Sequence, residues 1–165
     1  MRYGLSVVLC AFVMAECASA QEIVESQEHD FRVETFAEGF GVPWGMAFLP
    51  DGRLLVTERE GALRVVGKEG RLSAPVEGVP EVRAEGQGGL MDVALHPQYA
   101  QNGWIYLIFS DPLRGPIGDT LGHTAITRGK LRGKRLVSVE VIYRVPERFY
   151  SPHSHHYGAR IAFDR

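Results

Sequence analysis

The stretch Gly45-Met-Ala-Phe-Leu-Pro-Asp-Gly-Arg-Leu-Leu-Val-Thr57 decides the fold class. Two short apolar segments, residues 46–49 and 54–57, flank the turn sequence Pro50-Asp51-Gly52. Proline presets the backbone angle at the start of the turn, and glycine accepts the positive φ that follows. The stretch therefore predicts a β-hairpin, and Glu60-Gly61 predicts a second turn shortly afterwards.

The hairpin pattern recurs further along the chain. Met91-Asp-Val-Ala-Leu-His-Pro97 is followed, like the first copy, by a turn and an apolar segment, and Phe48 and Leu95 lie 47 positions apart. A third copy begins at Gly158-Ala-Arg-Ile-Ala-Phe-Asp-Arg165. Repeats of about 40–50 residues with several strands each are typical of β-propeller blades. We therefore expect an all-β propeller.

The remaining sequence also favours β-structure. Residues 134–145 contain neither glycine nor proline and are rich in β-branched side chains, which predicts a strand. Residues 104–109 are almost continuously apolar, which predicts a strand covered on both faces. Nothing after residue 20 predicts an amphipathic helix. A small β-sandwich with the same strand spacing stays open as an alternative fold.

The repeats are too few for a closed propeller. A blade has about four strands, and a propeller typically has four to eight blades. After the first twenty residues, roughly 145 residues remain, enough for about two to three blades at the usual spacing. Such an array would leave edge strands and apolar blade faces open to water. We therefore expect residues 31–165 to be a partial β-propeller domain, truncated at the C-terminus.

The first twenty residues differ in kind from the rest. Arg2 is followed by an apolar run over residues 3–15 and then by Ala18-Ser19-Ala20, the small-x-small pattern that signal peptidase cleaves. We expect residues 1–20 to be a signal peptide, cleaved after Ala20, and residues 21–30 to be a polar lead-in. The apolar run is too short to span a membrane. The mature protein would be periplasmic or secreted.

The composition argues against several classes of function. Cys10 and Cys17 are the only cysteines, and both lie in the predicted signal peptide, so the mature chain would have neither a disulfide nor a reactive thiolate. The 18 basic and 20 acidic side chains give a net charge of −2. No basic face that would bind nucleic acid is evident. A small-molecule site is compatible with this composition.

Two segments carry side chains suited to binding or catalysis. His153-Ser-His155-His156 places three imidazoles close together, which suits a metal site or a single general base near neutral pH. In Glu85-Gly-Gln87-Gly-Gly89, glycines let a ligand approach the backbone, and Gln87 offers both donors and an acceptor. The alternative without a function is a solvated polar loop for residues 153–156 and a plain turn for residues 85–89.

Two other features favour structural roles. Trp44, in Pro43-Trp44-Gly45, is expected to be an aromatic wedge between blades. Arg160 and Asp164 flank the last apolar segment, and a surface or inter-blade ion pair is the simplest interpretation of them.

Three motifs together resemble one known family. Val42-Pro-Trp-Gly-Met-Ala-Phe-Leu-Pro-Asp-Gly-Arg-Leu-Leu-Val-Thr-Glu-Arg59 resembles the opening blade of the soluble aldose sugar dehydrogenases, or glucose/sorbosone dehydrogenases. Gly86-Gln-Gly-Gly-Leu-Met-Asp-Val-Ala-Leu-His-Pro97 and His156-Tyr-Gly-Ala-Arg-Ile-Ala-Phe163 resemble later motifs of the same family. The resemblance covers about residues 31–165, and the order and spacing of the three motifs make it specific.

The resemblance implies a six-bladed β-propeller, usually periplasmic, that oxidises aldose sugars to lactones. Pyrroloquinoline quinone (PQQ) would lie at the top of the central channel beside a calcium ion. A histidine would take the proton of the sugar's anomeric hydroxyl while hydride passes to the quinone, and an external acceptor would receive the electrons. The protein would hold and polarise the cofactor that carries the redox chemistry.

The resemblance also assigns roles to two residues. The family's catalytic base precedes a Gly-x-Arg strand start, and alignment on Gly158 and Arg160 places it at His156. Gln87 matches the glutamine that lies near the quinone, so it is the expected cofactor contact. His155 stands where some relatives have an acidic residue that pairs with the base, and a neutral histidine does not supply that charge. The family's basic PQQ-binding residues and its calcium ligands would lie beyond the present sequence, so no metal ligand is assigned.

Two other functional interpretations stay open. A non-catalytic secreted propeller, or another β-domain, would bind a saccharide or a cell-wall partner and show no PQQ-dependent activity. Alternatively, the present chain would be an inactive fragment of a longer dehydrogenase.

Overall fold

The computed structural model describes residues 23–158 and 160–164. The predicted signal peptide, residues 1–20, lies outside the described residues. Among the helices of the described part, none is both long and apolar enough to cross a membrane.

The chain divides into two compact units, residues 1–35 and 36–165. In the first unit, β1 (Ile23–Val24) and β2 (Phe31–Arg32) form a two-stranded antiparallel sheet whose side chains are exposed. Strand β1 lies within the predicted polar lead-in. The second unit contains two larger sheets and both candidate site residues.

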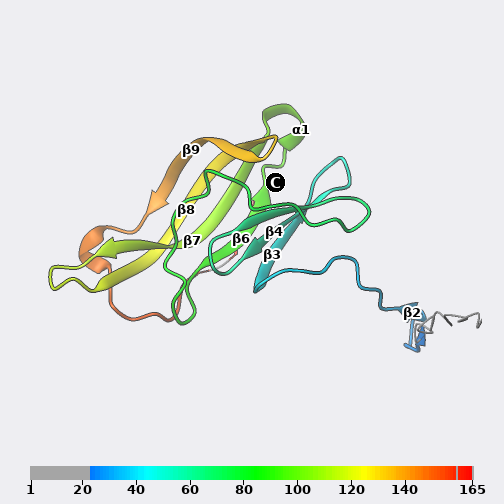
Figure 1. The fold of residues 1–165 in the computed structure, drawn as a ribbon, viewed down its shortest axis with the longest axis horizontal. Helices are drawn as coiled ribbons and strands as arrows, with labels where there is room; N and C mark the ends of the chain where they lie inside the picture. Colours follow the sequence, from blue (N-terminus) through cyan, green and yellow to red (C-terminus); the bar gives the residue numbers. More distant parts are fainter. Residues whose placement is uncertain (1–22, 159, 165) are drawn as a thin grey trace, which may run out of the picture. The chain divides into compact units, whose positions relative to one another are not determined.

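The first of these sheets has three antiparallel strands in the order β3-β4-β5 (Figure 1). They are β3 (Pro43–Phe48), β4 (Leu54–Glu58) and β5 (Leu63–Val66). The predicted hairpin between β3 and β4 is confirmed. The N–H of Leu49 donates to the carbonyl of Arg53 at 2.8 Å, and Gly52 has a φ of 85°, as the turn sequence requires.

The second sheet has four antiparallel strands in the order β6-β7-β8-β9 (Figure 1). They are β6 (Leu90–Leu95), β7 (Trp104–Arg114), β8 (Thr120–Arg132) and β9 (Arg135–Arg144). Residues 105–111 of β7 are buried, which confirms the strand expected to be covered on both faces. Strand β9 confirms the strand expected over residues 134–145.

Helices contribute little to the described residues. A four-residue helix, α1 (Tyr99–Asn102), joins β6 to β7, and a single 3₁₀ turn, η1 (Glu147–Phe149), follows β9. Both are too short to present an amphipathic face. The predicted all-β fold class is therefore confirmed.

The two large sheets pack against each other and share one core. Strands β3 and β4 contact β6, and the largest apolar cluster takes buried side chains from both sheets: Leu55, Leu63, Leu90, Val93, Leu107 and Phe109. Each sheet is a meander of consecutive strands that begins with one copy of the sequence repeat. Successive meanders are typical of propeller blades, whereas a sandwich commonly interleaves its strands by Greek-key connections.

Apolar side chains at both ends of this two-sheet array are exposed. On β3, Met46 is 66% and Phe48 is 69% exposed, and on β9 both Val141 and Ile142 are 43% exposed. These are the blade faces that no other sheet of the described residues covers. The expectation of open apolar faces is confirmed.

The third copy of the repeat does not form the expected strand in the described residues. The N–H of Ile161 donates instead to the side-chain carboxylate of Asp92 on β6, at 2.9 Å. A strand requires backbone hydrogen bonds to a neighbouring strand, and residues 160–164 have no such pairing. The described residues therefore contain two blade-like sheets, at the lower end of the expected two to three.

The structure corrects one detail and leaves another as a prediction. Trp44 is 45% exposed on β3, the strand that also carries the uncovered Met46 and Phe48, so it does not lie between the two described sheets, and its role as a wedge against another blade stays a prediction. Arg160 pairs with Asp92 of β6, at 3.6 Å between Nη1 and Oδ1. The expected ion pair is thus formed between a loop and a sheet, with a partner other than Asp164.

Candidate functional site

The glycine loop, residues 85–89, leads into β6 and is held at both ends by Ser110 of β7. The Ser110 hydroxyl donates to the carbonyl of Arg83 at 2.6 Å and accepts the N–H of Gly89 at 2.7 Å. The Ser110 backbone also exchanges hydrogen bonds with the same two residues, at 2.8 and 3.0 Å. Because Ser110 is fully buried, the loop is anchored in the core. Gln87 lies exposed near its middle.

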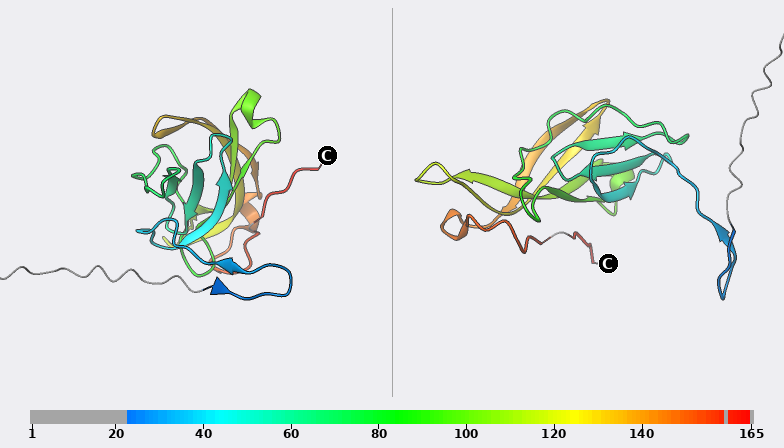
Figure 2. Two further views of the ribbon diagram at one scale, coloured as in Figure 1. Left: turned by 90° about the vertical axis from the view of Figure 1, so that its right-hand side faces the viewer. Right: turned by 60° about the horizontal axis from the view of Figure 1, so that its bottom comes forward.

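The histidine loop, residues 151–157, follows β9 and η1, and the chain reverses its direction after η1 (Figure 2). It lies directly against the glycine loop, because the N–H of Gln87 donates to the carbonyl of Ser154 at 2.8 Å. Gly86 makes this approach possible. A Cβ at that position would stand 2.5 Å from the Ser154 carbonyl oxygen, closer than any side chain tolerates.

The two residues assigned from the sequence meet where these loops touch. The backbone N–H of His156 donates to Oε1 of Gln87 at 2.8 Å. Both side chains are exposed. The contact uses the main chain of His156, so neither imidazole nitrogen is occupied by it. Their roles as base and cofactor contact stay predictions, but the structure does bring the two residues together.

His156 has a backbone φ of 64°, in the left-handed region. Non-glycine residues occupy this region infrequently, at a cost of order 1 kcal/mol. The conformation persists because hydrogen bonds hold the histidine loop on both sides of His156. Backbone strain of this kind is concentrated at functional sites. His156 is the residue of its loop that carries such a positive φ.

Arg83 is a residue of the site that the sequence analysis missed. Its side chain is only 5% exposed, and its guanidinium donates to the carbonyl of Pro152 at 2.8 Å and to the carboxylate of Glu85 at 2.8 Å. Buried arginines are uncommon unless they are paired. Here the pairs are with Glu85 and with the histidine loop, so the buried guanidinium and the loop stabilise each other. The nearest motif in the sequence is the glycine loop, which begins two residues after Arg83.

Tyr150, directly before Ser151, anchors the start of the histidine loop. Its hydroxyl donates to the carboxylate of Asp111 on β7, and the Arg144 guanidinium pairs with the same carboxylate at 2.8 Å. Burial raises the pKa of Tyr150, and the hydrogen bond to Asp111 raises it further. The phenol is therefore a protonated donor at neutral pH, and the chain enters the loop from a fixed point on the sheet.

The metal interpretation of the three histidines gains no support from the described residues. Within residues 23–158 and 160–164, no three histidine, cysteine or acidic side chains converge in a way that would hold a metal ion. The rings of His155 and His156 lie 6.3 Å apart, centroid to centroid. The general-base interpretation of a single histidine needs no such convergence.

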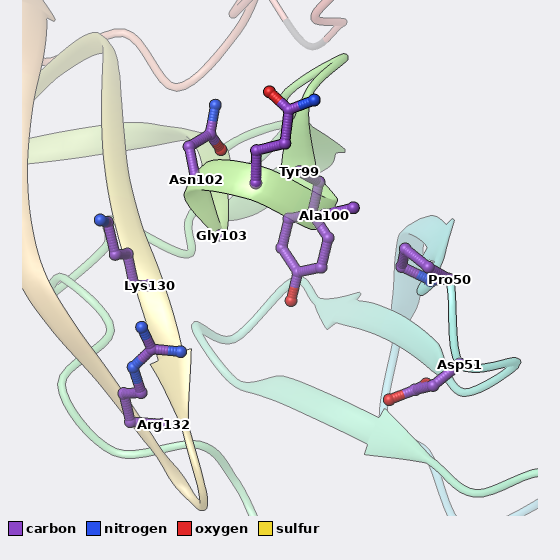
Figure 3. Close-up of a pocket in the computed structure, with 9 residues that line it drawn as sticks. Pro50, Asp51, Tyr99, Ala100, Asn102, Gly103, Lys130 and Arg132 are labelled. Carbon is purple, nitrogen blue, oxygen red and sulfur yellow. The ribbon is translucent and has the colours of Figure 1, made fainter.

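A pocket of about 380 Å³ lies at a different place on the second unit. Figure 3 shows Tyr99 between Lys130 and Arg132 of β8 and the turn at Pro50 and Asp51. Neither candidate site residue lines it. The pocket adjoins the start of β7, whereas the glycine loop is anchored seven residues further along, roughly 20 Å at the usual rise per residue.

A protein-family model described as glucose/sorbosone dehydrogenase matches residues 40–165. The chain belongs to this family. Two curated relatives also align with it. An uncharacterized protein of Synechocystis is 33% identical over 90% of this chain and 36% of its own length, and an aldose sugar dehydrogenase of Escherichia coli is 37% identical over 80% and 35%.

Solved structures of aldose sugar dehydrogenases share the fold. The apo form of the soluble aldose sugar dehydrogenase of Escherichia coli matches 79% of this chain and 37% of its own, at 36% identity and a TM-score of 0.69. The PQQ-bound aldose sugar dehydrogenase of Streptomyces coelicolor matches 68% and 33%, at 32% identity and a TM-score of 0.56. The two sheets are therefore part of a β-propeller. The chain spans about a third of the length of these relatives.

Proposed function

We propose that this chain supplies the catalytic base and one cofactor contact of a PQQ-dependent dehydrogenase that oxidises aldose sugars to lactones. The observation that carries the proposal is the hydrogen bond between the His156 backbone and Oε1 of Gln87, at 2.8 Å. It places the candidate base beside the candidate cofactor contact, on two loops 69 residues apart in the sequence. Membership of the family and the PQQ-bound relative support the choice of cofactor.

The orientation of Gln87 suits a flat, oxygen-rich cofactor such as PQQ. Because Oε1 accepts the His156 N–H, the amide nitrogen points elsewhere and keeps two donors. Those donors suit quinone or carboxylate oxygens. Residues 85–87 of the glycine loop are exposed, so a ring would meet no other part of the second unit covering them. The residues present therefore fit one edge of PQQ, with Gln87 as the group that would hold it.

His156 would act on the sugar. Its exposed imidazole would accept the proton of the anomeric hydroxyl at a ring nitrogen, the general-base role in which histidine is the side chain used most often. The anomeric carbon, which bears this hydroxyl, would give up a hydride to the quinone, and the product would be the lactone. When bound, PQQ supplies the two-electron acceptor that side chains do not provide, and an external acceptor then takes the electrons.

Calcium enters the proposal through the family alone. Among the described residues, no three histidine, cysteine or acidic side chains converge, so no carboxylate set that would hold a calcium ion is found there. We assign none of them to calcium and derive no step through it. The signal-peptide pattern of residues 1–20 supports a periplasmic or secreted location.

The experiment uses the native protein, purified from the periplasm of its source. Its intact mass tests whether the organism makes a chain longer than residues 21–165, as the proposed partial propeller requires. Dye reduction is then measured with aldoses, PQQ and calcium. Oxidation that depends on both PQQ and sugar supports the proposal. Retention of a saccharide without dye reduction would instead identify a non-catalytic binding propeller.

A further inference from the structure

We infer that Arg83 is a positioning residue: its buried guanidinium shapes the histidine loop so that His156 meets Gln87. The inference deepens the proposed function and rests on it only in treating His156 as the base. The geometry itself is independent of that role.

The contacts of Arg83 are unusual because three consecutive carbonyls converge on one side chain. Nη1 donates to the carbonyls of Ser151 at 3.1 Å and His153 at 3.3 Å, and Nη2 donates to that of Pro152 at 2.8 Å. Carbonyl oxygens that point at one another repel, since each carries a partial negative charge. A chain therefore curls in this way only around a cation or a fork of donors.

Arginine is the side chain that matches this demand. Its guanidinium carries five N–H donors in a rigid plane and keeps its charge when it is buried. Nε and the second N–H of Nη2 donate to the Glu85 carboxylate, at 3.0 and 2.8 Å. Nη1 also lies 3.4 Å from the Tyr157 hydroxyl. The same group thus holds the glycine loop through Glu85 and the histidine loop through its carbonyls.

The backbone of Arg83 is itself fixed to the sheet. It exchanges hydrogen bonds with Ser110 of β7, whose hydroxyl also binds Gly89 at the far end of the glycine loop. The connection therefore runs from β7 through Arg83 to residues 151–153 and ends where His156 meets Gln87. Without the guanidinium, the three carbonyls lose their common donor, and the position of His156 relative to Gln87 rests on fewer contacts, among them the hydrogen bonds of Gln87 with Ser154 and His156.

Arg64 provides a matched control. It is also a largely buried arginine, 16% exposed, that binds one carboxylate, Glu58, and one loop carbonyl, Ser73. It lies on β5 and touches neither the glycine loop nor the histidine loop in the contacts that the structure describes. Arg83→Met and Arg64→Met remove comparable interactions at two places, so only effects at the site separate them.

The test introduces Arg83→Met, Arg83→Lys and Arg64→Met into the chromosomal gene and uses the purified native proteins. Hydrogen–deuterium exchange is followed by mass spectrometry in peptides that cover the two loops. We expect Arg83→Met to speed exchange at least tenfold in both loops, Arg83→Lys to restore part of the protection, and Arg64→Met to leave both loops unchanged. Equal loosening by Arg64→Met, or unchanged loops in Arg83→Met, overturns the inference.

Kinetics test the consequence for the base. We expect Arg83→Met to lower kcat for PQQ-dependent sugar oxidation about 100-fold, as a misplacement of about 1 Å does, while KM for the sugar changes less than threefold. A loss confined to KM overturns the positioning role. If the wild-type protein oxidises no sugar, the proposed function fails, and the exchange data still decide whether Arg83 holds the loop.

A second variant covers the case in which Arg83→Met does not fold. A Cβ on Gly122 of β8 would stand 2.9 Å from Cδ of Arg83 and 2.9 Å from the Tyr157 hydroxyl, so Gly122→Ala displaces the guanidinium without deleting it. Gly129→Ala is its control on the same strand, since its Cβ would meet the Leu136 side chain at 2.7 Å. Faster loop exchange in Gly122→Ala alone supports the inference, and equal exchange in the two variants overturns it.

Discussion

The backbone N–H of His156 donates a 2.8 Å hydrogen bond to the side-chain carbonyl oxygen of Gln87, 69 residues earlier in the chain. The bond assigns the two ends of the Gln87 amide, because only the oxygen accepts an N–H. It also leaves the imidazole of His156 out of the contact. The proposed base and the proposed cofactor contact are therefore separable by substitution, since each proposed role uses atoms that the shared hydrogen bond does not.

Replacement of His156 by asparagine tests the base. Asparagine tolerates a positive φ and keeps the backbone N–H, so His156→Asn removes the imidazole with little cost to the loop. We expect kcat to fall by about 10²–10⁴-fold, the usual contribution of a general base, while the Kd for PQQ changes less than threefold. Steady-state kinetics and a PQQ titration measure the two effects. His29→Asn, at an exposed histidine of the first unit, is the matched control. Undiminished turnover in His156→Asn rules out the assignment.

Two substitutions at Gln87 separate its acceptor from its donors. Gln87→Glu keeps an oxygen for the His156 N–H but loses the amide donors and adds a negative charge beside a cofactor that carries carboxylates. We expect it to weaken PQQ binding about tenfold or more while the loops stay protected from exchange. Gln87→Ala should weaken PQQ binding and also speed loop exchange. If Gln87→Glu binds PQQ as the wild type does, Gln87 is not a cofactor contact.

The sequence predicted the local elements of the fold well because their signals are local. Pro50-Asp51-Gly52 carries its own turn chemistry, and the apolar run that became β7 needs no knowledge of its partners. The strand predicted from the third repeat copy is absent from the described residues, because a strand needs a partner that lies elsewhere in the chain. The apolar pattern of this copy is that of a strand, but Ile161 bonds to the Asp92 side chain instead.

The site residues also differ in whether a local sequence signal marks them. Gln87 and His156 lie in motifs that resemble a family, so they were named before their contact was known. Arg83 was not, because its partners are backbone carbonyls 68 to 70 residues away. Every residue has a carbonyl, so no pattern of residue types marks the place where three of them converge.

Tyr150→Phe tests how the histidine loop is anchored. Burial and the hydrogen bond to Asp111 raise the pKa of Tyr150 in the folded state. The protonated phenol is thus favoured by folding, and its contribution is complete below the unfolded pKa of about 10 and is lost as the pH rises above it. We expect Tyr150→Phe to cost about 1–2 kcal/mol at pH 7, from the lost hydrogen bond to a carboxylate.

Urea unfolding between pH 7 and pH 11 measures this effect. The stability of the wild type should approach that of Tyr150→Phe as the pH rises above 10, because only the wild type has this phenol to ionise on unfolding. Tyr143→Phe, which removes a phenol that is 53% exposed on β9, should change the midpoint little at pH 7. A gap between wild type and Tyr150→Phe that stays constant to pH 11 contradicts the anchor.

Gly45→Ala tests the contact between the two sheets, on which the site depends. A Cβ on Gly45 of β3 would lie 2.8 Å from the carbonyl oxygen of Met91 and 2.9 Å from Oδ1 of Asp92. The main chain of β6 has no room to yield, because buried Thr57 already ties Gly45 to Met91 by hydrogen bonds of 2.9 and 2.8 Å. We expect a loss of about 1–3 kcal/mol in unfolding free energy, as for overpacked cores.

Gly67→Ala is the control for that loss, since the nearest atom to its Cβ would be at 3.7 Å, an ordinary contact. It should change stability by less than about 0.5 kcal/mol. The effect of Gly45→Ala should also reach the chain's last described segment, because Asp92 accepts the N–H of Ile161 and moves with β6. Faster exchange at Ile161 in Gly45→Ala, but not in Gly67→Ala, would show that the packing of the two sheets holds the segment that follows His156. Equal stability of the two variants would mean that β3 and β6 are not in the close contact from which this prediction is derived.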